Sequence, residues 1–418
     1  MQFTTSFLAF SFGALALILP SGYSWGPAAL LLCAIGAAIR YRSAKFILPR
    51  PEDKVLVISF ILFFLVALFE VLVHGTTTSE LDKPSRFILA LLVLALLNER
   101  PPSESWVWLG FATGAIGACL VALYHVFVVG LHRAGGGMNP IQFGNLSMLL
   151  GLISLCGIGY TLKNEKKAFL FKIFMSAAFF AGVLGSFLSG TRGGWLALAV
   201  IPPIVFVFYA QSVNTKKVLA GIFLICIASV VLMNVAGNSV ERRINSAITE
   251  MEAYHDVNNT RSSLGVRLEL WKTAWLLGKS KPLIGWGTNG LQEGKQHLVE
   301  QELVSKNALR FSHAHNDYLD LFQKRGALGF LSVVLLYLVP GIFFFQAARN
   351  NDPGKPVALA GMTTTLSYSI FSLSQAFLEH NSGVMMYAFS VVIFWCLYKA
   401  RSRRYVSNPE LYVHSFRG

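Results

Sequence analysis

Long runs of apolar residues, separated by short polar segments, extend along most of this chain. A helix needs about 20 predominantly apolar residues to cross the hydrocarbon core of a bilayer, and many of these runs approach that length. The pattern therefore predicts an all-α polytopic membrane protein with about twelve transmembrane helices. The predicted spans are residues 5–20, 26–40, 55–74, 86–98, 106–130, 142–161, 169–188, 194–210, 218–235, 327–347, 356–378 and 384–399.

One segment between the ninth and tenth predicted spans is long and hydrophilic. Within it, four apolar side chains recur at helical spacing and form one face: Leu264, Leu268, Trp271 and Trp275. This pattern is typical of an amphipathic helix whose aromatic rings lie in the headgroup layer. The chain is thus expected to have three parts: residues 1–235 with spans one to nine, residues 236–326 as a loop whose amphipathic helices cap the bundle, and residues 327–418 with spans ten to twelve and a tail.

The composition and the charge distribution agree with a membrane protein. Hydrophobic residues make up 54% of the chain and charged residues 13%, whereas soluble domains carry roughly 25% charged residues. The net charge of +14 does not indicate nucleic-acid binding, because the basic residues are spread over several loops. Lys and Arg are concentrated in alternate loops and after the last span, so the positive-inside rule predicts cytoplasmic termini and an external 236–326 loop.

The strongest candidate for chemistry is a cluster of polar residues directly before the tenth predicted span: His313, His315, Asn316 and Asp317. An imidazole with an ordinary pKa of about 6.5 can act as a general base, and here His315 would lie at the membrane boundary. Two other interpretations remain open. Asn316 could be a helix N-cap beside a packing histidine, and the two histidines with Asp317 have the spacing of metal ligands. The sequence disfavours a metal because no second ligand cluster occurs in the other external segments.

Two external arginines are candidates for phosphate binding. Arg192 is flanked by three glycines at the start of a span, where bare backbone N–H groups and the helix dipole favour an anion. Arg267 lies at the edge of the predicted amphipathic helix, four residues before Trp271. Each could instead be an interfacial arginine whose side chain reaches the headgroups. Arg86 and Arg133 are further external basic residues whose positions are more typical of topology than of catalysis.

Three motifs, in their order and spacing, resemble those of the superfamily of O-antigen ligases, O-antigen polymerases and protein O-oligosaccharyltransferases. The motifs are residues 189–195, residues 265–287, and His315-Asn316 followed by Gly326 and Gly329. The similarity is greatest from about residue 185 to residue 329. It implies a twelve-helix fold with a periplasmic cap in a bacterial inner membrane, and an inverting glycosyl transfer on the periplasmic side that needs neither a metal nor another cofactor.

The resemblance also implies roles for the candidate residues. Arg192 and Arg267 would bind the pyrophosphate of an undecaprenyl-pyrophosphate-linked O-antigen, which is the donor. His315 would activate a sugar hydroxyl of lipid A–core, the acceptor. Members that could support them are His313, Asn316, Asp317, Arg86 and Arg133.

Within the superfamily, the sequence favours a ligase. A length of 418 residues without a large C-terminal soluble domain disfavours the protein oligosaccharyltransferases, and Tyr318-Leu319 after the histidine motif favours a ligase over a polymerase. A non-enzymatic alternative is an exporter of lipid or polysaccharide. An exporter needs ionisable groups on both sides of the membrane, and the candidates Glu70, His125 and Glu379 lie near predicted span ends.

Overall fold

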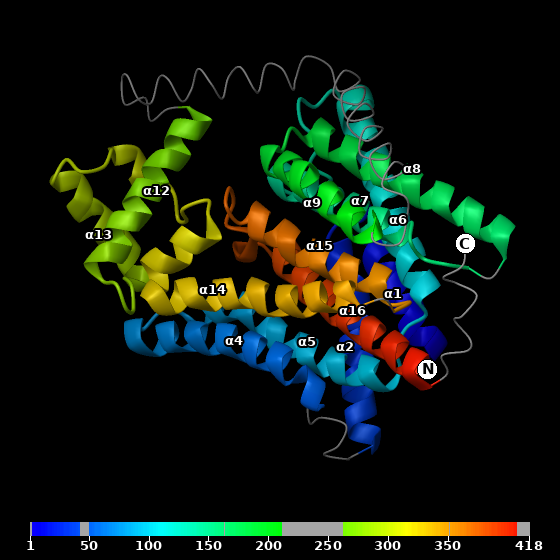
Figure 1. Ribbon diagram of the computed structural model, residues 1–418. Coiled ribbons are helices and arrows are strands. Elements are labelled where there is room, and N and C mark those ends of the chain that lie inside the picture. Colours follow the sequence, from blue (N-terminus) through cyan, green and yellow to red (C-terminus); the bar gives the residue numbers. More distant parts are fainter. Residues whose placement is uncertain (1, 42–49, 163, 211–261, 351, 408–418) are drawn as a thin grey trace.

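The computed structural model describes residues 2–41, 50–162, 164–210, 262–350 and 352–407, and the regular structure in these residues is helical (Figure 1). It contains thirteen α-helices: α1 (Gln2–Leu15), α2 (Gly22–Tyr41), α4 (Lys54–His74), α5 (Asp82–Glu99), α6 (Glu104–Leu123), α7 (Pro140–Gly157), α8 (Glu165–Ser189), α9 (Arg192–Ala210), α12 (Ser263–Ser280), α13 (Gly287–Glu300), α14 (Asp317–Arg349), α15 (Lys355–Phe371) and α16 (Asn381–Ser407).

The prediction of an all-α polytopic membrane protein is confirmed. Among the described residues, eight helices are long and apolar enough to cross a membrane: α2, α4, α6, α7, α8, α9, α14 and α16. Three other predicted spans fall on α1, α5 and α15, of which α1 has 14 residues and α15 has 17. The predicted span 218–235 lies outside the described residues. The total of twelve spans stays a prediction.

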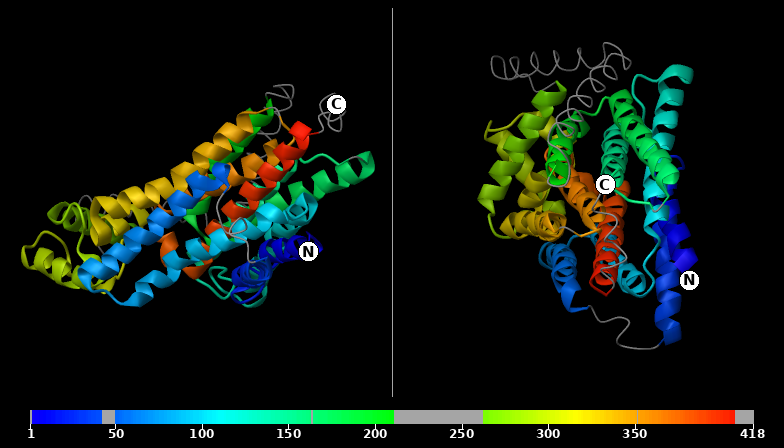
Figure 2. Two further views of the ribbon diagram at one scale, coloured as in Figure 1. Left: turned by 90° about the horizontal axis from the view of Figure 1, so that it is seen from below. Right: turned by 45° about the vertical axis from the view of Figure 1, so that its right-hand side comes forward.

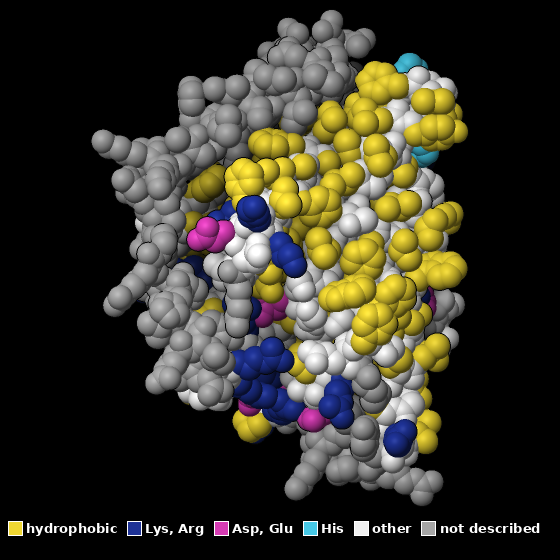
Figure 3. Space-filling view, turned by 90° about the vertical axis from the view of Figure 1, so that its right-hand side faces the viewer, with side chains coloured by type: hydrophobic (Ala, Val, Ile, Leu, Met, Phe, Trp, Pro, Cys, Tyr) yellow, Lys and Arg dark blue, Asp and Glu magenta, His cyan; other side chains and the backbone are white. Residues whose placement is uncertain are grey.

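Two of the eight candidate spans lie at the centre of the bundle. The apolar windows of α7 and α16 are 89% and 94% buried inside the protein, whereas those of the other six candidate spans are between 33% and 44% buried. The outer helices expose large apolar side chains such as Leu32, Leu72 and Phe169. Hydrophobic side chains cover much of the right-hand part of the face in Figure 3, and several Lys and Arg side chains lie in its lower half. Such a surface fits a lipid environment.

Small residues let α7 and α8 approach closely. A Cβ atom on Gly182 of α8 would lie 2.6 Å from the carbonyl oxygen of Ser147 of α7. The Ser147 hydroxyl donates a hydrogen bond of 2.9 Å to the carbonyl oxygen of Gly182. Glycine is therefore required at this contact, as it is at many close helix crossings in membranes.

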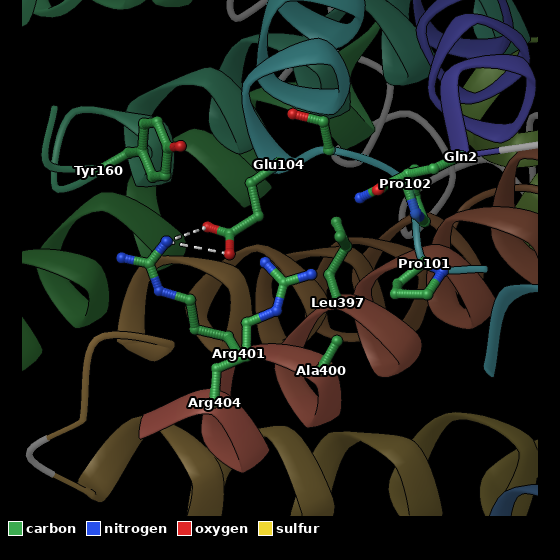
Figure 4. Close-up of a pocket in the computed structure, with 10 residues that line it drawn as sticks. Gln2, Pro101, Pro102, Glu104, Tyr160, Leu397, Ala400, Arg401 and Arg404 are labelled. Carbon is green, nitrogen blue, oxygen red and sulfur yellow. Dashed lines mark hydrogen bonds and ion pairs between the residues drawn. The ribbon is translucent and has the colours of Figure 1, made fainter. Parts of the chain in front are cut away.

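Charged residues gather at one end of the bundle, where α16 ends. Arg50 pairs with Glu99, and Lys399 pairs with the buried carboxylate of Asp53. A cavity of about 130 Å³ lies there, and in Figure 4 Arg401 is paired with Glu104 inside it, with Arg404 alongside. At a helical rise of 1.5 Å per residue, this cluster is roughly 30 Å from the start of α16. The positive-inside rule assigns such an end to the cytoplasm, and that orientation stays a prediction.

A group of shorter helices lies beside the other end of the bundle, where α12 and α13 adjoin the start of α14 (Figure 1). The apolar face predicted for α12 is not its buried face. Trp275 is 52% exposed, whereas Leu270, Ala274 and Leu277 are buried. Phe322 of α14 packs against Gly278 on this second face and against the ring of Trp275, with 5.6 Å between the ring centroids. The predicted face remains partly exposed, as a side chain in the headgroup layer would be.

A kink at Gly326 joins this group of helices to the bundle. Gly326 interrupts α14 with φ of 61°, and α14 then continues beside α4 (Figures 1 and 2). The segment before α13 docks on the kink, because Ala327 N–H donates to the Pro282 carbonyl (2.7 Å) and Trp286 N–H donates to the Gln323 carbonyl (2.9 Å). The predicted division at 235/236 and 326/327 stays a prediction.

Replacement of Gly326 by alanine is expected to destabilise the protein by about 1–3 kcal/mol, because φ is positive there. The added Cβ would also lie 2.4 Å from the Leu283 carbonyl carbon. The measurement is the midpoint of thermal unfolding of the purified protein in detergent. Gly290→Ala is the matched control, since a Cβ on Gly290 meets nothing closer than 3.7 Å. Equal midpoints for the two variants would contradict the role of the kink.

Candidate active site

His315 lies in the short connection that precedes α14, with its side chain half-buried. Its backbone adopts φ of 50°, a left-handed conformation that is uncommon for a residue other than glycine. The surrounding contacts hold this conformation. The N–H of Ala314 donates to the Asp320 carboxylate (2.7 Å), and the N–H of His315 donates to Nδ1 of His313 (3.3 Å). The fold therefore supports a strained backbone at the candidate base, as often occurs at functional sites.

The imidazole of His315 is held neutral by its surroundings. Burial lowers its pKa most, a hydrogen bond with Gln375 raises the pKa, and the nearby positive charge of Arg267 lowers it, with a net shift below the usual value. Burial, followed by the electrostatic interaction with the neighbouring His315 ring, likewise lowers the pKa of His313, to about 4. Arg267 is thus close enough to His315 to act on it electrostatically. Two of the three principal residues predicted from the sequence therefore lie within electrostatic range of each other.

Asn316 and Asp317 have structural contacts. Asn316 is the N-cap of α14, as one of the alternative interpretations predicts, because its side-chain oxygen accepts from the N–H of Leu319 (3.1 Å). Asp317 is buried and accepts from the hydroxyl of Ser372 (2.6 Å) and from the N–H groups of Phe377 (3.0 Å) and Leu378 (3.2 Å). Its carboxylate thus fixes the loop of residues 372–378, which follows α15.

Arg192 is the first residue of α9 and is half-buried. It follows a tight turn in which Gly190 has φ of 64°. Thr191 anchors this turn by donating to the carbonyl oxygen of Pro140 (3.0 Å), and Arg133 donates to the carbonyl oxygen of Ser189 (2.8 Å). Arg133, which the sequence suggests as a supporting residue, thus braces the turn that presents Arg192.

The turn at Arg192 and the loop 372–378 are neighbours. A Cβ atom on Gly193 would lie 2.9 Å from the hydroxyl oxygen of Ser374, and Ser374 directly precedes the Gln375 that contacts His315. The same loop therefore contacts the start of α9 on one side and the candidate base on the other. The three residues predicted from motifs far apart in sequence belong to one region of the fold.

Sequence reasoning missed several polar groups of this region. Gln142 and Asn145 of α7 are fully buried and have no hydrogen-bond partner, and Asn145 lies 3.2 Å from a Cβ built on Gly193. The sequence did indicate these two residues, because both are polar and lie within a predicted apolar span. Polar side chains inside a membrane are costly and are usually functional. Gln375 carried no such signal, because it lies at the end of a predicted span.

A network of ion pairs lies at the start of α14, close in sequence to His315. Lys324 contacts Asp320 and Glu379, each at 2.7 Å, and the positive charge of Lys324 lowers the pKa of Glu379. Arg325 pairs with Glu70 of α4 at 2.5 Å. Glu70 and Glu379, considered above for an exporter, thus both belong to pairs at the end of the bundle that carries His315.

Arg86 pairs with Asp82 on the same helix at 2.9 Å and is not among the contacts of His315. Within the described residues, no group of three or more His, Cys, Asp or Glu side chains is arranged to hold a metal ion. Metal independence of the reaction stays a prediction.

A family model described as O-antigen ligase matches residues 177–334, which include Arg192, Arg267 and His315. A Haemophilus influenzae protein described as uncharacterized is 30% identical over 397 residues, which cover 94% of this chain and 98% of that protein. The chain belongs to the O-antigen ligase family. The resemblance seen in the sequence is confirmed, and members of the O-antigen ligase family generally transfer lipid-linked glycans.

Replacement of Asp317 by asparagine is expected to loosen the loop 372–378, because an amide oxygen cannot accept from all three donors around it. Each buried donor left without a partner costs about 1–3 kcal/mol. Hydrogen–deuterium exchange measures this as faster exchange of the loop amides. Asp82→Asn is the control, since Asp82 is exposed and its carboxylate pairs with Arg86 on the surface. Unchanged exchange in the Asp317 variant would contradict the anchoring role.

Proposed function

We propose that this member of the O-antigen ligase family is an O-antigen ligase. It would transfer O-antigen from undecaprenyl pyrophosphate to a sugar hydroxyl of lipid A–core, with inversion and without a metal, at the periplasmic face of a bacterial inner membrane. The observation that carries the proposal is the position of a neutral imidazole, His315, within electrostatic reach of Arg267. Both lie inside the segment that matches the family.

The two arginines suit the donor. A diphosphate leaving group gains negative charge as its bond to the sugar breaks, and guanidinium groups at a boundary of low dielectric stabilise that charge without a cation. Arg192 also begins a helix, whose positive dipole end favours the same anion. Binding the donor at this boundary would align its sugar with the acceptor and so reduce the entropic cost of the reaction.

His315 suits the acceptor. The acceptor oxygen forms a bond with the anomeric carbon on the face opposite the pyrophosphate, and the bond from that carbon to the phosphate oxygen breaks with its electron pair. The acceptor hydroxyl proton passes to the neutral imidazole, and undecaprenyl pyrophosphate leaves. A positioned general base contributes about 10²–10⁴-fold to such a step. Since burial lowers the pKa of His315, the imidazole stays ready to accept a proton below neutral pH.

The acceptor distinguishes the candidate activities within the family. The family description supports a ligase, which uses lipid A–core, whereas a polymerase lengthens the glycan on its own carrier and a protein oligosaccharyltransferase uses a side chain. The exporter has less support, because Glu70 and Glu379 form ion pairs at one end of the bundle. His125, the third group considered, accepts from the N–H of Gly135 at 3.5 Å.

The proposal is tested by transfer in vitro with purified protein, undecaprenyl-pyrophosphate-linked O-antigen and lipid A–core, in buffer with EDTA and with the products separated on a gel. The expected result is a ladder of glycan on lipid A–core. His315→Ala is expected to reduce the rate at least about 100-fold while donor binding persists, because the phosphate contacts remain. The control is His132→Ala, since His132 is exposed.

Three outcomes would correct the proposal. Glycan growth on its own carrier would identify a polymerase. A near wild-type rate for His315→Ala would show that His315 is not the general base. Loss of activity in EDTA with rescue by a divalent cation would establish a metal requirement.

Arg192→Lys is expected to lower kcat/KM for the donor about 10-fold or more, because an ammonium cannot form the two parallel hydrogen bonds of a guanidinium with phosphate. The measurement is the initial rate at several donor concentrations. Arg310→Lys is the control, because Arg310 is exposed in a short helix of the cap (Lys306–Arg310). Full activity of Arg192→Lys would mean that any positive charge suffices at this position.

A further inference from the structure

The side chain of Gln375 connects two histidines. Its Oε1 lies 2.8 Å from Nδ1 of His315, and its Nε2 lies 3.1 Å from Nε2 of His380. Gln375 is 1% exposed, so water cannot easily replace either contact. The described chain thus contains a continuous His315–Gln375–His380 connection through one amide group.

An amide between two imidazoles imposes a direction on both rings. Its oxygen only accepts and its NH₂ only donates, whereas a neutral imidazole has one nitrogen that donates and one that accepts. With Oε1 facing His315, that ring carries its proton on Nδ1 and leaves Nε2 bare. The NH₂ group then donates to Nε2 of His380, which must also be bare. If the amide turned over, its NH₂ would face Nδ1 of His315, and the ring proton would move to Nε2.

The loop keeps the amide in place between the two rings. Asp317 holds Ser372 on one side of Gln375 and the N–H groups of Phe377 and Leu378 on the other. Asn316 adds a hydrogen bond from its Nδ2 to the carbonyl oxygen of Leu373 (3.1 Å). The backbone of the loop is therefore fixed, and the amide can exchange its two ends only by rotation of the side chain.

We propose that Gln375 is a positioning residue that keeps the base nitrogen of His315 at Nε2, and that His380 switches this arrangement off when it is protonated. A protonated His380 carries hydrogen on Nε2 and needs an acceptor, so the amide oxygen turns towards it. The NH₂ group then faces His315, whose Nε2 becomes protonated and cannot accept the hydroxyl proton. This inference rests on the proposed role of His315 as the base.

The charged groups around the relay set the pH at which it acts. Arg267 from α12 and Asp320 from α14 act electrostatically on His315, and the ring of His313 contacts it. Glu379, Lys83 and His315 itself act on His380. Burial lowers the pKa of both His315 and His380. Transfer should therefore be full near neutral pH and fall only as the pH drops below the usual histidine value of about 6.5. Because a proton on either His315 or His380 switches the enzyme off, log kcat/KM should approach a slope of two at pH values below both pKa values.

The experiment compares pH profiles of transfer for the full-length wild-type protein and three variants. His380→Gln supplies an oxygen in place of the titrating nitrogen, so the rate near neutral pH should stay within a few fold while the acid slope falls to one. Gln375→Glu can accept from His315 and adds a negative charge, so activity should persist and its acid limb should move to higher pH. Gln375→Met loses the orienting contact, and kcat should fall about 10–100-fold with the donor KM little changed, as for other groups that orient a histidine.

The possible results separate this inference from the proposed base. If His315→Ala keeps near wild-type activity, the base itself is wrong. If His315→Ala is inactive but the acid slope of the wild type is one and is unchanged in His380→Gln, the switch is wrong. A wild-type rate for Gln375→Met would overturn the positioning role. Retention of activity in Gln375→Glu guards against misfolding as the explanation for the methionine variant.

Discussion

The buried carboxylate of Asp317 joins the two segments on which the candidate active site is built. It begins α14, two residues after His315, and it accepts three hydrogen bonds from the loop that follows α15. A buried carboxylate is costly unless donors surround it, so the loop and the helix start are each required by the other. Through this contact the position of Gln375 is fixed relative to His315, and the loop also carries Ser374 towards the start of α9.

Buried ion pairs near the site also connect elements that are distant in sequence, at the kink in α14. Lys324 and Arg325 lie just before the kink at Gly326, where α14 leaves the cap. Each is buried and paired with a carboxylate from an element distant in sequence, η5 (Phe377–Glu379) for Lys324 and α4 for Arg325. Breaking one such pair leaves an uncompensated charge at low dielectric. Ion pairs require specific partners at short distance, so Lys324 and Arg325 fix the start of α14 relative to η5 and α4.

Local pattern was sufficient for much of this architecture, and it identified Arg192, Arg267 and His315 as candidate residues. Apolar runs identify the helices. The glycines around Arg192 predict a tight turn, because glycine readily adopts the positive φ that such a turn requires, as Gly190 does. The contacts that complete the site could not be predicted in this way. Gln375 is 60 residues from His315 in sequence, and nothing in its neighbours indicates which side chain it meets. The sequence pattern identified one apolar face of α12 but not the second face, with Leu270, Ala274 and Leu277, which the fold buries.

The central position of α16 has a consequence for how the protein is made. Translation proceeds from the N-terminus, so α16 leaves the ribosome after the other described helices, including α5 and α15, which enclose it. The contacts that α5 and α15 make with α16 can therefore form only after α16 has been synthesised. His380 directly precedes α16 and Gln375 lies five residues before that histidine. The side chains proposed to orient His315 are therefore translated after Arg192 and Arg267, so the order of synthesis would delay completion of the candidate site.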